Sequence, residues 1–292
     1  MPGTTMTELK RYFSPTSLDQ AVECLKDGDV TILAGGTDLT PQSQAGRIKF
    51  KQTLMNIRRI PQLSGITLEG DEIRIGALST ITEVMEHPLV RERLPVLAEA
   101  CDHFASDQIR NAATIGGNIC NASPAGDTLI PLLVLDACVE LASMPEAKLY
   151  RHCMPLAEFF VGPGKTRKSL CELVTGVRIP LPGPDRIARF YKHGTRPALD
   201  ISAISIGVAA DVANGVMTKV RVAFGAVAPT PVRAKATEKA LEGRRLDEAT
   251  IAAAAHAARD EVSPIDDVRA TAWYRKEMIH NMTKRVLENV RG

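Results

Sequence analysis

Two short stretches of this sequence place a pair of adjacent glycines directly behind a short apolar run. In the first, the run 30–34 ends at Gly35 and Gly36. In the second, at 113–118, the sequence is Ala-Thr-Ile-Gly-Gly-Asn. Because glycine has no Cβ, the backbone at such a pair can turn with a positive φ and approach a ligand closely. One strand ending in Gly-Gly indicates no more than a tight turn, whereas two in one chain could flank a diphosphate from two sides.

The two stretches lack the residues of the common nucleotide-binding loops. No Lys-Ser or Lys-Thr pair follows either pair of glycines, so neither is a P-loop, and neither fits the G-x-G-x-x-G fingerprint. A nucleotide held here would therefore be bound by backbone N–H groups and hydroxyls, with no lysine in the loop. Pro41 suits the first turn of a short helix behind the first loop.

The composition is that of an ordinary globular protein. Of the 292 residues, 45% are hydrophobic and 24% are charged, and the net charge of +2 favours neither nucleic acid nor an anionic membrane as a partner. The longest apolar run, 129–141, is interrupted by Asp136 and Glu140 and is too short to span a bilayer. Residues 1–11 contain no apolar segment typical of a secretory signal, so we expect a cytoplasmic protein.

Cysteine and histidine are scattered along the chain. The six cysteines, at positions 24, 101, 120, 138, 153 and 171, include no C-x-x-C pair and accompany no group of histidines. Zinc and iron–sulfur sites usually show such clusters, so we expect buried free thiols and no metal ligand in this chain. The six histidines are isolated, and no Ser/His/Asp or Cys/His arrangement indicates a catalytic residue.

The apolar pattern and the turn signals predict a mixture of helices and strands in the first part of the chain. Ser17 and Gln20 form a capping box at the start of a helix over 14–27. Another helix begins at Asp127, whose side chain can cap it. The other expected elements are strands at 30–34, 50–57, 66–68, 72–75, 139–142 and 173–179, a helix from Thr80 (with a capping box to Glu83) to Pro88, and a helix at 95–103.

The pattern changes after the stretch Pro-Leu-Pro-Gly-Pro at 180–184, which indicates a domain boundary. Behind it, two long β-type runs, 201–213 and 216–227, are joined by Asn-Gly at 214–215, the signature of a type I′ hairpin. The remaining sequence is helical, at 234–241, 247–261 and 270–290. The second part is therefore expected to be an antiparallel sheet followed by helices.

The two glycine stretches resemble the FAD-binding motifs of the flavin subunit of molybdenum hydroxylases, the xanthine dehydrogenase and carbon monoxide dehydrogenase medium-subunit family. The motifs are Leu-Ala-Gly-Gly-Thr-Asp-Leu at 33–39 and Gln-Ile-Arg-Asn-Ala-Ala-Thr-Ile-Gly-Gly-Asn-Ile at 108–119, and the match continues through 121–127, 162–165, 191–193 and 198–202 into the last helix. Prokaryotic xanthine dehydrogenase flavin subunits look closest. The resemblance covers essentially the whole chain.

The resemblance implies an α+β fold in two parts. A FAD-binding domain of the vanillyl-alcohol-oxidase (PCMH) type would occupy residues 1–178, with subdomains at about 1–60 and 61–178. A smaller domain of antiparallel sheet and helices, of the CO dehydrogenase flavoprotein C-terminal type, would occupy residues 186–292.

The resemblance also implies that FAD binds without a covalent bond, with the first loop around its diphosphate. This loop consists of Thr31, Ile32, Leu33, Ala34, Gly35, Gly36, Thr37 and Asp38. It would act mainly through backbone N–H groups, with the hydroxyl of Thr37 as an addition, while Asp38 holds the loop or caps the next helix. The other wall would come from Ala113, from Thr114 and from the amides of Ile115, Gly116 and Gly117.

Four single residues match further family positions, and most have a plainer structural alternative. Phe104 would pack near the flavin, or serve only as a core residue. Asp127 would face the ribityl or adenosine end of the cofactor, cap a helix, or do both. Leu173 would line the flavin or adenine region. Lys192 would lie close to the isoalloxazine, where a fixed cation stabilises the reduced anion, unless it pairs with a surface acid.

The implied function is electron transfer within a molybdenum hydroxylase complex. The FAD would take electrons from the 2Fe-2S iron–sulfur clusters of one partner subunit, a molybdopterin subunit would oxidise the substrate, and NAD would be the final acceptor. A purine is the expected substrate, with nicotinate, carbon monoxide and aromatic acyl-CoA as alternatives. Two other classes stay open, namely a stand-alone flavin oxidase of the vanillyl-alcohol type and a redox-silent nucleotide-binding or scaffold protein.

Overall fold

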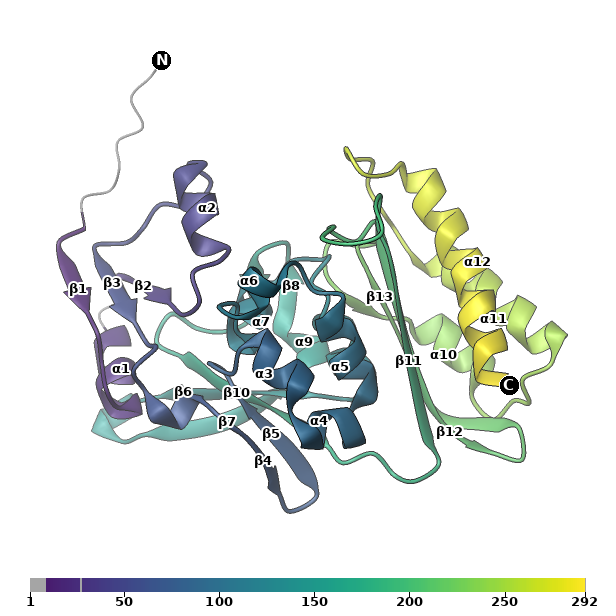
Figure 1. The fold of residues 1–292 in the computed structure, drawn as a ribbon, viewed down its shortest axis with the longest axis horizontal. Helices are drawn as coiled ribbons and strands as arrows, with labels where there is room; N and C mark the ends of the chain where they lie inside the picture. Colours follow the sequence, from purple (N-terminus) through teal and green to yellow (C-terminus); the bar gives the residue numbers. More distant parts are fainter. Residues whose placement is uncertain (1–8, 27, 292) are drawn as a thin grey trace.

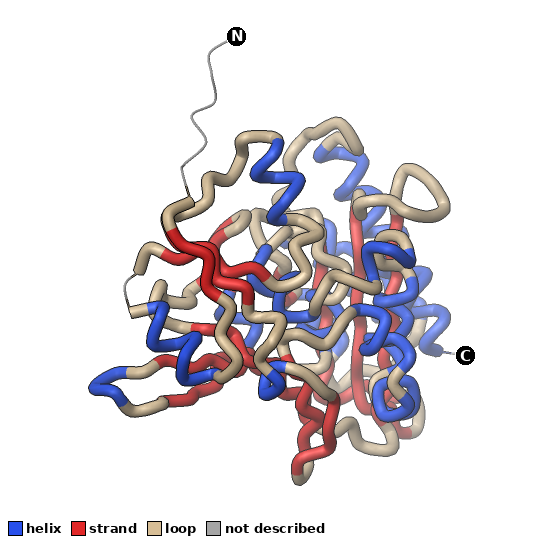
Figure 2. Tube along the Cα trace, turned by 60° about the vertical axis from the view of Figure 1, so that its left-hand side comes forward, coloured by secondary structure: helices blue, strands red, loops and turns tan. Residues whose placement is uncertain are grey.

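Three groups of strands with their helices lie side by side along the long axis of the molecule (Figure 1). The structure is a computed structural model that describes residues 9–26 and 28–291. Figure 2 shows the same groups from a second direction. Helices and strands are mixed along the chain, which confirms the predicted α+β class. Among the described residues, no helix combines the length and the apolar character that crossing a membrane requires.

The N-terminal layer is a three-stranded parallel sheet in the order β1-β3-β2. Its strands are β1 (Arg11–Phe13), β2 (Val30–Leu33) and β3 (Thr53–Asn56). The predicted strands at 30–34 and 50–57 are confirmed by β2 and β3, whereas β1 is a strand that the sequence pattern does not indicate. Because β2 lies at one edge of the sheet, the first glycine loop leaves the sheet at that edge (Figure 1).

Two helices accompany this sheet. Helix α1 (Leu18–Leu25) begins where the Ser17 hydroxyl accepts the N–H of Gln20 at 3.3 Å. The Gln20 side chain bonds the N–H of Thr16 and not that of Ser17, so only half of the predicted capping box forms. Position 27, the predicted end of this helix, lies outside the described residues. Helix α2 (Leu39–Gln44) follows the first glycine loop and has Pro41 in its first turn, as predicted.

The middle layer is a five-stranded antiparallel sheet in the order β4-β5-β10-β6-β7, with short helices on it. At the start of α3 both halves of the predicted capping box form, because Thr80 and Glu83 each accept the backbone N–H of the other. Pro88 ends α3 and also begins α4, since proline is tolerated in a first turn. The strands are β4 (Ile66–Glu69), β5 (Glu72–Gly76), β6 (Cys138–Ser143), β7 (Tyr150–Pro155) and β10 (Leu173–Pro180), and the helices are α3 (Ile81–Glu86), α4 (Pro88–Arg93), α5 (Pro95–Asp102), α6 (Asp107–Arg110), α7 (Ile115–Asn121), α8 (Leu129–Val134) and α9 (Leu156–Phe159), with a small hairpin of β8 (Phe160–Gly162) and β9 (Lys165–Thr166).

The C-terminal layer is a four-stranded antiparallel sheet in the order β11-β12-β13-β14, followed by three helices. The predicted hairpin is confirmed, and Asn214 and Gly215 have the positive φ angles, 52° and 75°, that a type I′ turn requires. Strand β11 is not predicted by the sequence pattern. The elements are β11 (Arg186–His193), β12 (Ile204–Ala213), β13 (Val216–Gly225), β14 (Val232–Arg233), α10 (Lys235–Leu241), α11 (Glu248–Glu261) and α12 (Ala272–Arg291).

The C-terminal sheet is covered on both faces. One face contributes Phe190, Ala209 and Ala223 to the core of the middle layer, where they pack in one cluster with residues of α8. The other face packs against α10, α11 and α12 in a separate core. The chain passes between the two sheets from Pro180 to Arg186, at the predicted boundary. We propose that this linker divides the chain into domains at 1–178 and 186–292. The two sheets share a core, so the domains fold against each other.

The expectation about the cysteines is wrong in part. Cys138 and Cys153 form a disulfide between neighbouring strands β6 and β7, with Cα atoms 5.8 Å apart, and Cys120 and Cys171 are exposed. The predicted set of buried free thiols therefore holds for only part of the cysteines. His256 and His280, isolated in sequence, bring their rings to 4.8 Å across the α11–α12 contact. Both pairs are formed by packing between elements, which sequence spacing does not reveal.

Candidate functional site

The first glycine loop leaves a row of backbone donors unused. Gly36 has a φ of +74°, a conformation that favours glycine. Among the described residues, the N–H groups of residues 35–38 donate to no protein acceptor. The apolar side chains of Ile32 and Leu33, which precede this turn, are only partly buried. The loop therefore offers free backbone donors beside a half-covered apolar strand, as a bound nucleotide requires.

Side chains around this loop hold its shape. The hydroxyl of Thr31 accepts the N–H of Lys51 at 2.8 Å, so it links β2 to the start of β3. Asp38 occupies the position before α2, but its side chain makes no capping bond. Its carboxylate instead accepts from the Gln42 amide, which also lies 3.3 Å from the side-chain oxygen of Asn121 on α7. Of the two roles expected for Asp38, helix capping is wrong and holding the loop agrees with the structure.

The second glycine loop has its backbone donors engaged. The N–H of Ile115 donates to the carbonyl of Ser79 at 3.0 Å, and that of Gly116 donates to Ala77 at 2.9 Å. The N–H of Gly117 donates to the hydroxyl of Thr114 at 3.1 Å, which makes Thr114 the N-cap of α7. The three amides that were expected to form the second wall of a phosphate site are therefore used inside the protein.

The glycines of the second loop allow close packing. A Cβ on Gly116 would lie 2.6 Å from the Cβ of Ala77, so α7 fits against the segment after β5 only without a side chain there. A Cβ on Gly35 would lie 2.0 Å from the carbonyl oxygen of Ala112. The first loop thus rests directly on the backbone just before Ala113, which is itself buried. The two loops therefore meet through their backbones, and the prediction that both flank a diphosphate stays a prediction.

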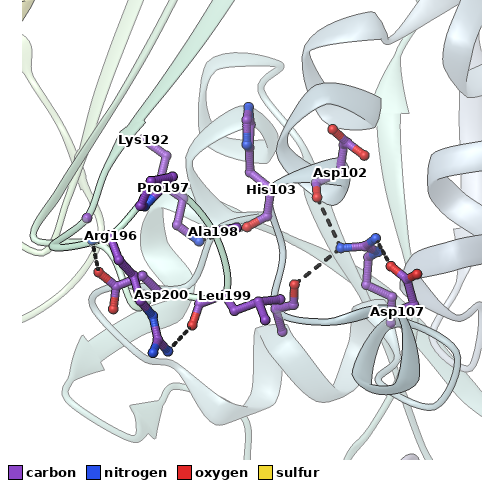
Figure 3. A pocket seen from close by; sticks show the side chains of 12 residues that line it. Asp102, His103, Asp107, Lys192, Arg196, Pro197, Ala198, Leu199 and Asp200 are labelled. Atoms are coloured by element: carbon purple, nitrogen blue, oxygen red, sulfur yellow. Dashed lines mark hydrogen bonds and ion pairs between the residues drawn. The ribbon is translucent and has the colours of Figure 1, made fainter.

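A cavity of about 380 Å³ lies between the turn that joins α5 to α6 and the loop that joins β11 to β12 (Figure 3). Lys192 of β11 lies in its wall, and Figure 3 shows His103 and Asp102 on one side with Leu199 and Asp200 on the other. The lining residues are Asp102, His103, Ala105, Asp107, Arg110, Lys192, Gly194, Arg196, Pro197, Ala198, Leu199 and Asp200.

Lys192 is held by a buried carboxylate. Its ammonium donates to Asp127 Oδ2 at 2.7 Å and to the carbonyl of His103 at 2.8 Å. The other oxygen of Asp127 accepts the hydroxyl of Ser202 at 2.9 Å. Burial raises the pKa of the Asp127 carboxyl, and the charge and hydrogen bond of Lys192 and the Ser202 hydroxyl oppose this rise. Asp127 and Lys192, predicted separately as cofactor residues, therefore form an ion pair.

Asp127 does not cap a helix. Helix α8 begins at Leu129, two residues later than predicted, and the residue before it, Thr128, makes no side-chain capping bond. Both carboxylate oxygens of Asp127 are occupied by residues of the C-terminal part, so the capping alternative is wrong. The alternative that Lys192 forms a salt bridge is correct, but its partner is a buried acid and not a surface one, since Asp127 is 7% exposed.

Comparison with known proteins assigns the chain to a family. Residues 5–182 match the family model of the FAD binding domain in molybdopterin dehydrogenase, and residues 189–290 match that of the CO dehydrogenase flavoprotein C-terminal domain. This chain belongs to the FAD-binding subunits of the molybdenum hydroxylases. The resemblance of the two glycine motifs to this family is thereby confirmed.

Relatives of this FAD-binding subunit serve different enzymes. The xanthine dehydrogenase FAD-binding subunit of Escherichia coli O157:H7 is 32% identical over 285 residues, which cover 97% of this chain and 96% of the relative. The nicotinate dehydrogenase FAD-subunit of Eubacterium barkeri is 33% identical over 286 residues, or 96% and 95% of the two chains. The solved carbon monoxide dehydrogenase of Hydrogenophaga pseudoflava has a chain that superimposes with a TM-score of 0.89 at 32% identity, covering 94% of each.

The other two predicted cofactor residues lie in different surroundings. Phe104 is partly buried in the α5–α6 turn and packs against the core of the middle layer, which agrees with a core role, while its contact with the flavin stays a prediction. Leu173 is only 2% exposed and packs in the core beneath the N-terminal layer. Its side chain presents little surface to a ligand, and its contact with FAD stays a prediction.

Sequence reasoning missed two residues here: Arg110, which lines the cavity, and Ser202, which bonds to Asp127. Arg110 donates to the carbonyls of Asp102, Phe104 and Ala105 at 2.9–3.3 Å, while Lys192 takes the carbonyl of the residue between, His103. Four successive carbonyls of the α5–α6 turn are thus fixed by two cations. Arg110 stands inside the second motif, which is the signal that could have drawn attention to it. Ser202, the other missed residue, has no comparable signal apart from its place in the stretch 198–202.

Proposed function

We propose that this subunit binds FAD non-covalently through the first glycine loop and relays electrons from the iron–sulfur clusters of a partner subunit to NAD, in a cytoplasmic complex that oxidises a purine. The observation that carries the proposal is the row of N–H groups at 35–38 without protein acceptors among the described residues. Such a row suits the oxygen atoms of a diphosphate. Bound FAD supplies a carrier that takes up electrons singly and releases them in pairs.

Lys192 would act at the redox end of the cofactor. Its ammonium lines the cavity, and Asp127 and the carbonyl of His103 fix it there. A cation in a fixed position stabilises negative charge that develops beside it. The α5–α6 turn, which carries Phe104, would form the neighbouring wall, held in shape by Arg110. Residues of this chain would thus hold FAD at both ends.

The substrate of the complex would be bound by the molybdopterin subunit. Similarity to a xanthine dehydrogenase subunit supports a purine, and nearly equal similarity to a nicotinate dehydrogenase subunit makes nicotinate the main rival. End-to-end similarity to such subunits supports a complex with iron–sulfur and molybdopterin partners over a stand-alone oxidase of the vanillyl-alcohol type. Purification of the native complex, with dye reduction measured for hypoxanthine and for nicotinate, separates the two substrates.

The isolated chain provides the direct test of the electron-relay role. We expect a yellow protein whose colour is released completely by acid precipitation, because FAD is not covalently bound. Anaerobic NADH should bleach the flavin, whereas hypoxanthine should not, since we expect no molybdenum ligand in this chain. A colourless protein that takes up no added FAD would contradict the proposal and favour a redox-silent role. Bleaching by hypoxanthine alone would contradict the division of labour between subunits.

A further inference from the structure

Ser202, from the C-terminal part of the chain, bonds to the ion pair of Asp127 and Lys192. It lies just before β12, is 1% exposed, and donates its hydroxyl to Asp127 Oδ1 at 2.9 Å. Asp127 lies between α7 and α8, and its other oxygen accepts from Lys192 of β11 at 2.7 Å. Each oxygen of this buried carboxylate therefore has one donor from the C-terminal sheet region.

The hydrogen bond from Ser202 matters because the ionisation of Asp127 decides how much of the Lys192 charge is neutralised. A buried carboxylate stays ionised only where charges and hydrogen-bond donors replace the lost water. Burial raises the pKa of Asp127, and the charge and hydrogen bond of Lys192, the Ser202 hydroxyl and the charge of His103 oppose the rise. If Asp127 were protonated, the ammonium of Lys192 would keep its full charge at the cavity wall.

We propose that Ser202 is a positioning residue of the flavin site: its hydroxyl favours the ionised form of Asp127 and thereby helps to set the net charge that Asp127 and Lys192 present to the cofactor. The inference rests on the proposed function in one respect, that the redox end of FAD lies in the cavity beside Lys192. Ser202 itself acts through Asp127, whose carboxylate it contacts. The two ionised groups largely cancel, so the field at the flavin is weaker than that of a lone lysine.

Ser205 provides a matched control on the same segment. It is also buried, at 0% exposure, and its hydroxyl has no hydrogen-bond partner among the described residues. Replacement of either serine by alanine removes one buried oxygen atom. Only the change at Ser202 removes a donor from a carboxylate, so a difference between the two variants reports on Asp127.

The first measurement is the reduction potential of the bound FAD as a function of pH. In Ser202→Ala we expect the potential to rise above that of the unchanged protein as the pH falls, because Asp127 takes up a proton more readily and leaves Lys192 uncompensated. Ser205→Ala should follow the unchanged protein at every pH, and Ser202→Thr, which keeps a hydroxyl, should restore the original curve. In an Asp127→Asn background, Ser202→Ala should cause no further shift.

A second measurement uses the protein freed of FAD, so that it does not depend on the proposed function. The folded-state pKa of Asp127 is raised, so its ionisation opposes folding above that pKa, and loss of the Ser202 donor should increase this penalty. The loss of melting temperature in Ser202→Ala should therefore be larger at pH 8 than at pH 5, while that in Ser205→Ala is the same at both.

The outcomes separate the inference from the proposed function. Ser202→Ala and Ser205→Ala that behave alike in both measurements would overturn the inference. A pH-dependent melting difference with an unchanged potential curve would also overturn it, because Ser202 would then stabilise the fold without acting on the flavin. Failure of the unchanged protein to bind FAD would instead refute the proposed function, and the melting experiment would still report on the contact between Ser202 and Asp127.

Discussion

In the first glycine loop, the N–H groups of residues 35–38 have no protein acceptor among the described residues, whereas in the second loop those of residues 115–117 are all engaged. The two loops carry the same Gly-Gly pair after an apolar step. In the first, Gly36 takes up a left-handed conformation, and in the second, Gly116 makes room for Ala77. Similar sequences thus form a turn with unused backbone donors in one place and allow helix packing in the other.

The difference shows how the second loop supports the first. Free donors can bind a ligand only if the loop keeps its position. The backbone at Ala112, which lies directly against Gly35, holds the first loop in place. The second loop supplies that backbone, and its own hydrogen bonds to Ala77 and Ser79 make it rigid. We infer that the first loop binds the cofactor and that the second supports the first.

The largest effect is expected for Gly35→Ala. Its Cβ would lie 2.0 Å from a backbone oxygen of Ala112, so the two loops must separate. We expect nearly complete loss of bound FAD and a loss of folding free energy of about 3 kcal/mol. Flavin absorbance per protein and thermal denaturation check this. Gly183→Ala is the control, because nothing lies within 4 Å of its Cβ. Normal flavin content in Gly35→Ala would show that the loops need not touch.

A smaller effect, of a different kind, is expected for Gly116→Ala. The added Cβ would lie 2.6 Å from that of Ala77, and the resulting overpacking should cost about 2 kcal/mol of folding free energy. Because residue 116 does not donate to the cofactor in this account, the protein that remains folded should still bind FAD with nearly unchanged affinity. Chemical denaturation and FAD titration measure the two quantities separately. A large loss of affinity at unchanged stability would place the second loop in direct contact with the phosphates.

Thr114→Ala should have a still smaller effect. It removes the oxygen that caps α7 by accepting the N–H of Gly117, which should cost about 1 kcal/mol of folding free energy. FAD affinity should fall little. Thr114→Ser, which keeps the hydroxyl, should restore stability in the same denaturation assay. If serine restored FAD affinity without affecting stability, the hydroxyl of Thr114 would be a cofactor ligand.

The smallest effect is expected for Asp38→Asn in the first loop. This side chain is exposed, and asparagine keeps an oxygen that can accept from Gln42. If the diphosphate lies against this loop, removal of the negative charge should tighten FAD binding by less than about 1 kcal/mol, and added salt should reduce the gain. Titration of the FAD-free protein at two salt concentrations measures both. Weaker binding in Asp38→Asn would indicate that the carboxylate accepts a hydrogen bond from the cofactor.

Local patterns predicted the elements whose signals are local. The capping box of Thr80 and Glu83, the turn at 214–215 and strand β2 depend on neighbouring residues and were correct. The turn behind β2 was also predicted, because a pair of glycines favours a turn with positive φ whatever surrounds it, and Gly36 has a φ of +74°.

What could not be predicted depends on residues far apart in the chain. The acceptors that engage the second loop come from Ala77 and Ser79, on a segment before α3. Lys192 lies 65 positions from Asp127, and no periodicity in the sequence joins them. The place of Lys192 beside the flavin stays a prediction, and the structure adds that its charge is paired with that of the buried Asp127. The family resemblance identified both residues without indicating that they pair.

Amide hydrogen exchange resolved to single residues tests the central claim most directly, with the FAD-free and the FAD-loaded subunit compared. Residues 35–38 should exchange fast without FAD and become protected when it binds, because their N–H groups gain phosphate acceptors. Residues 115–117 should be protected in both forms, since their donors are already engaged. Fast exchange at 115–117 without FAD, with protection gained there on binding and none at 35–38, would contradict the account.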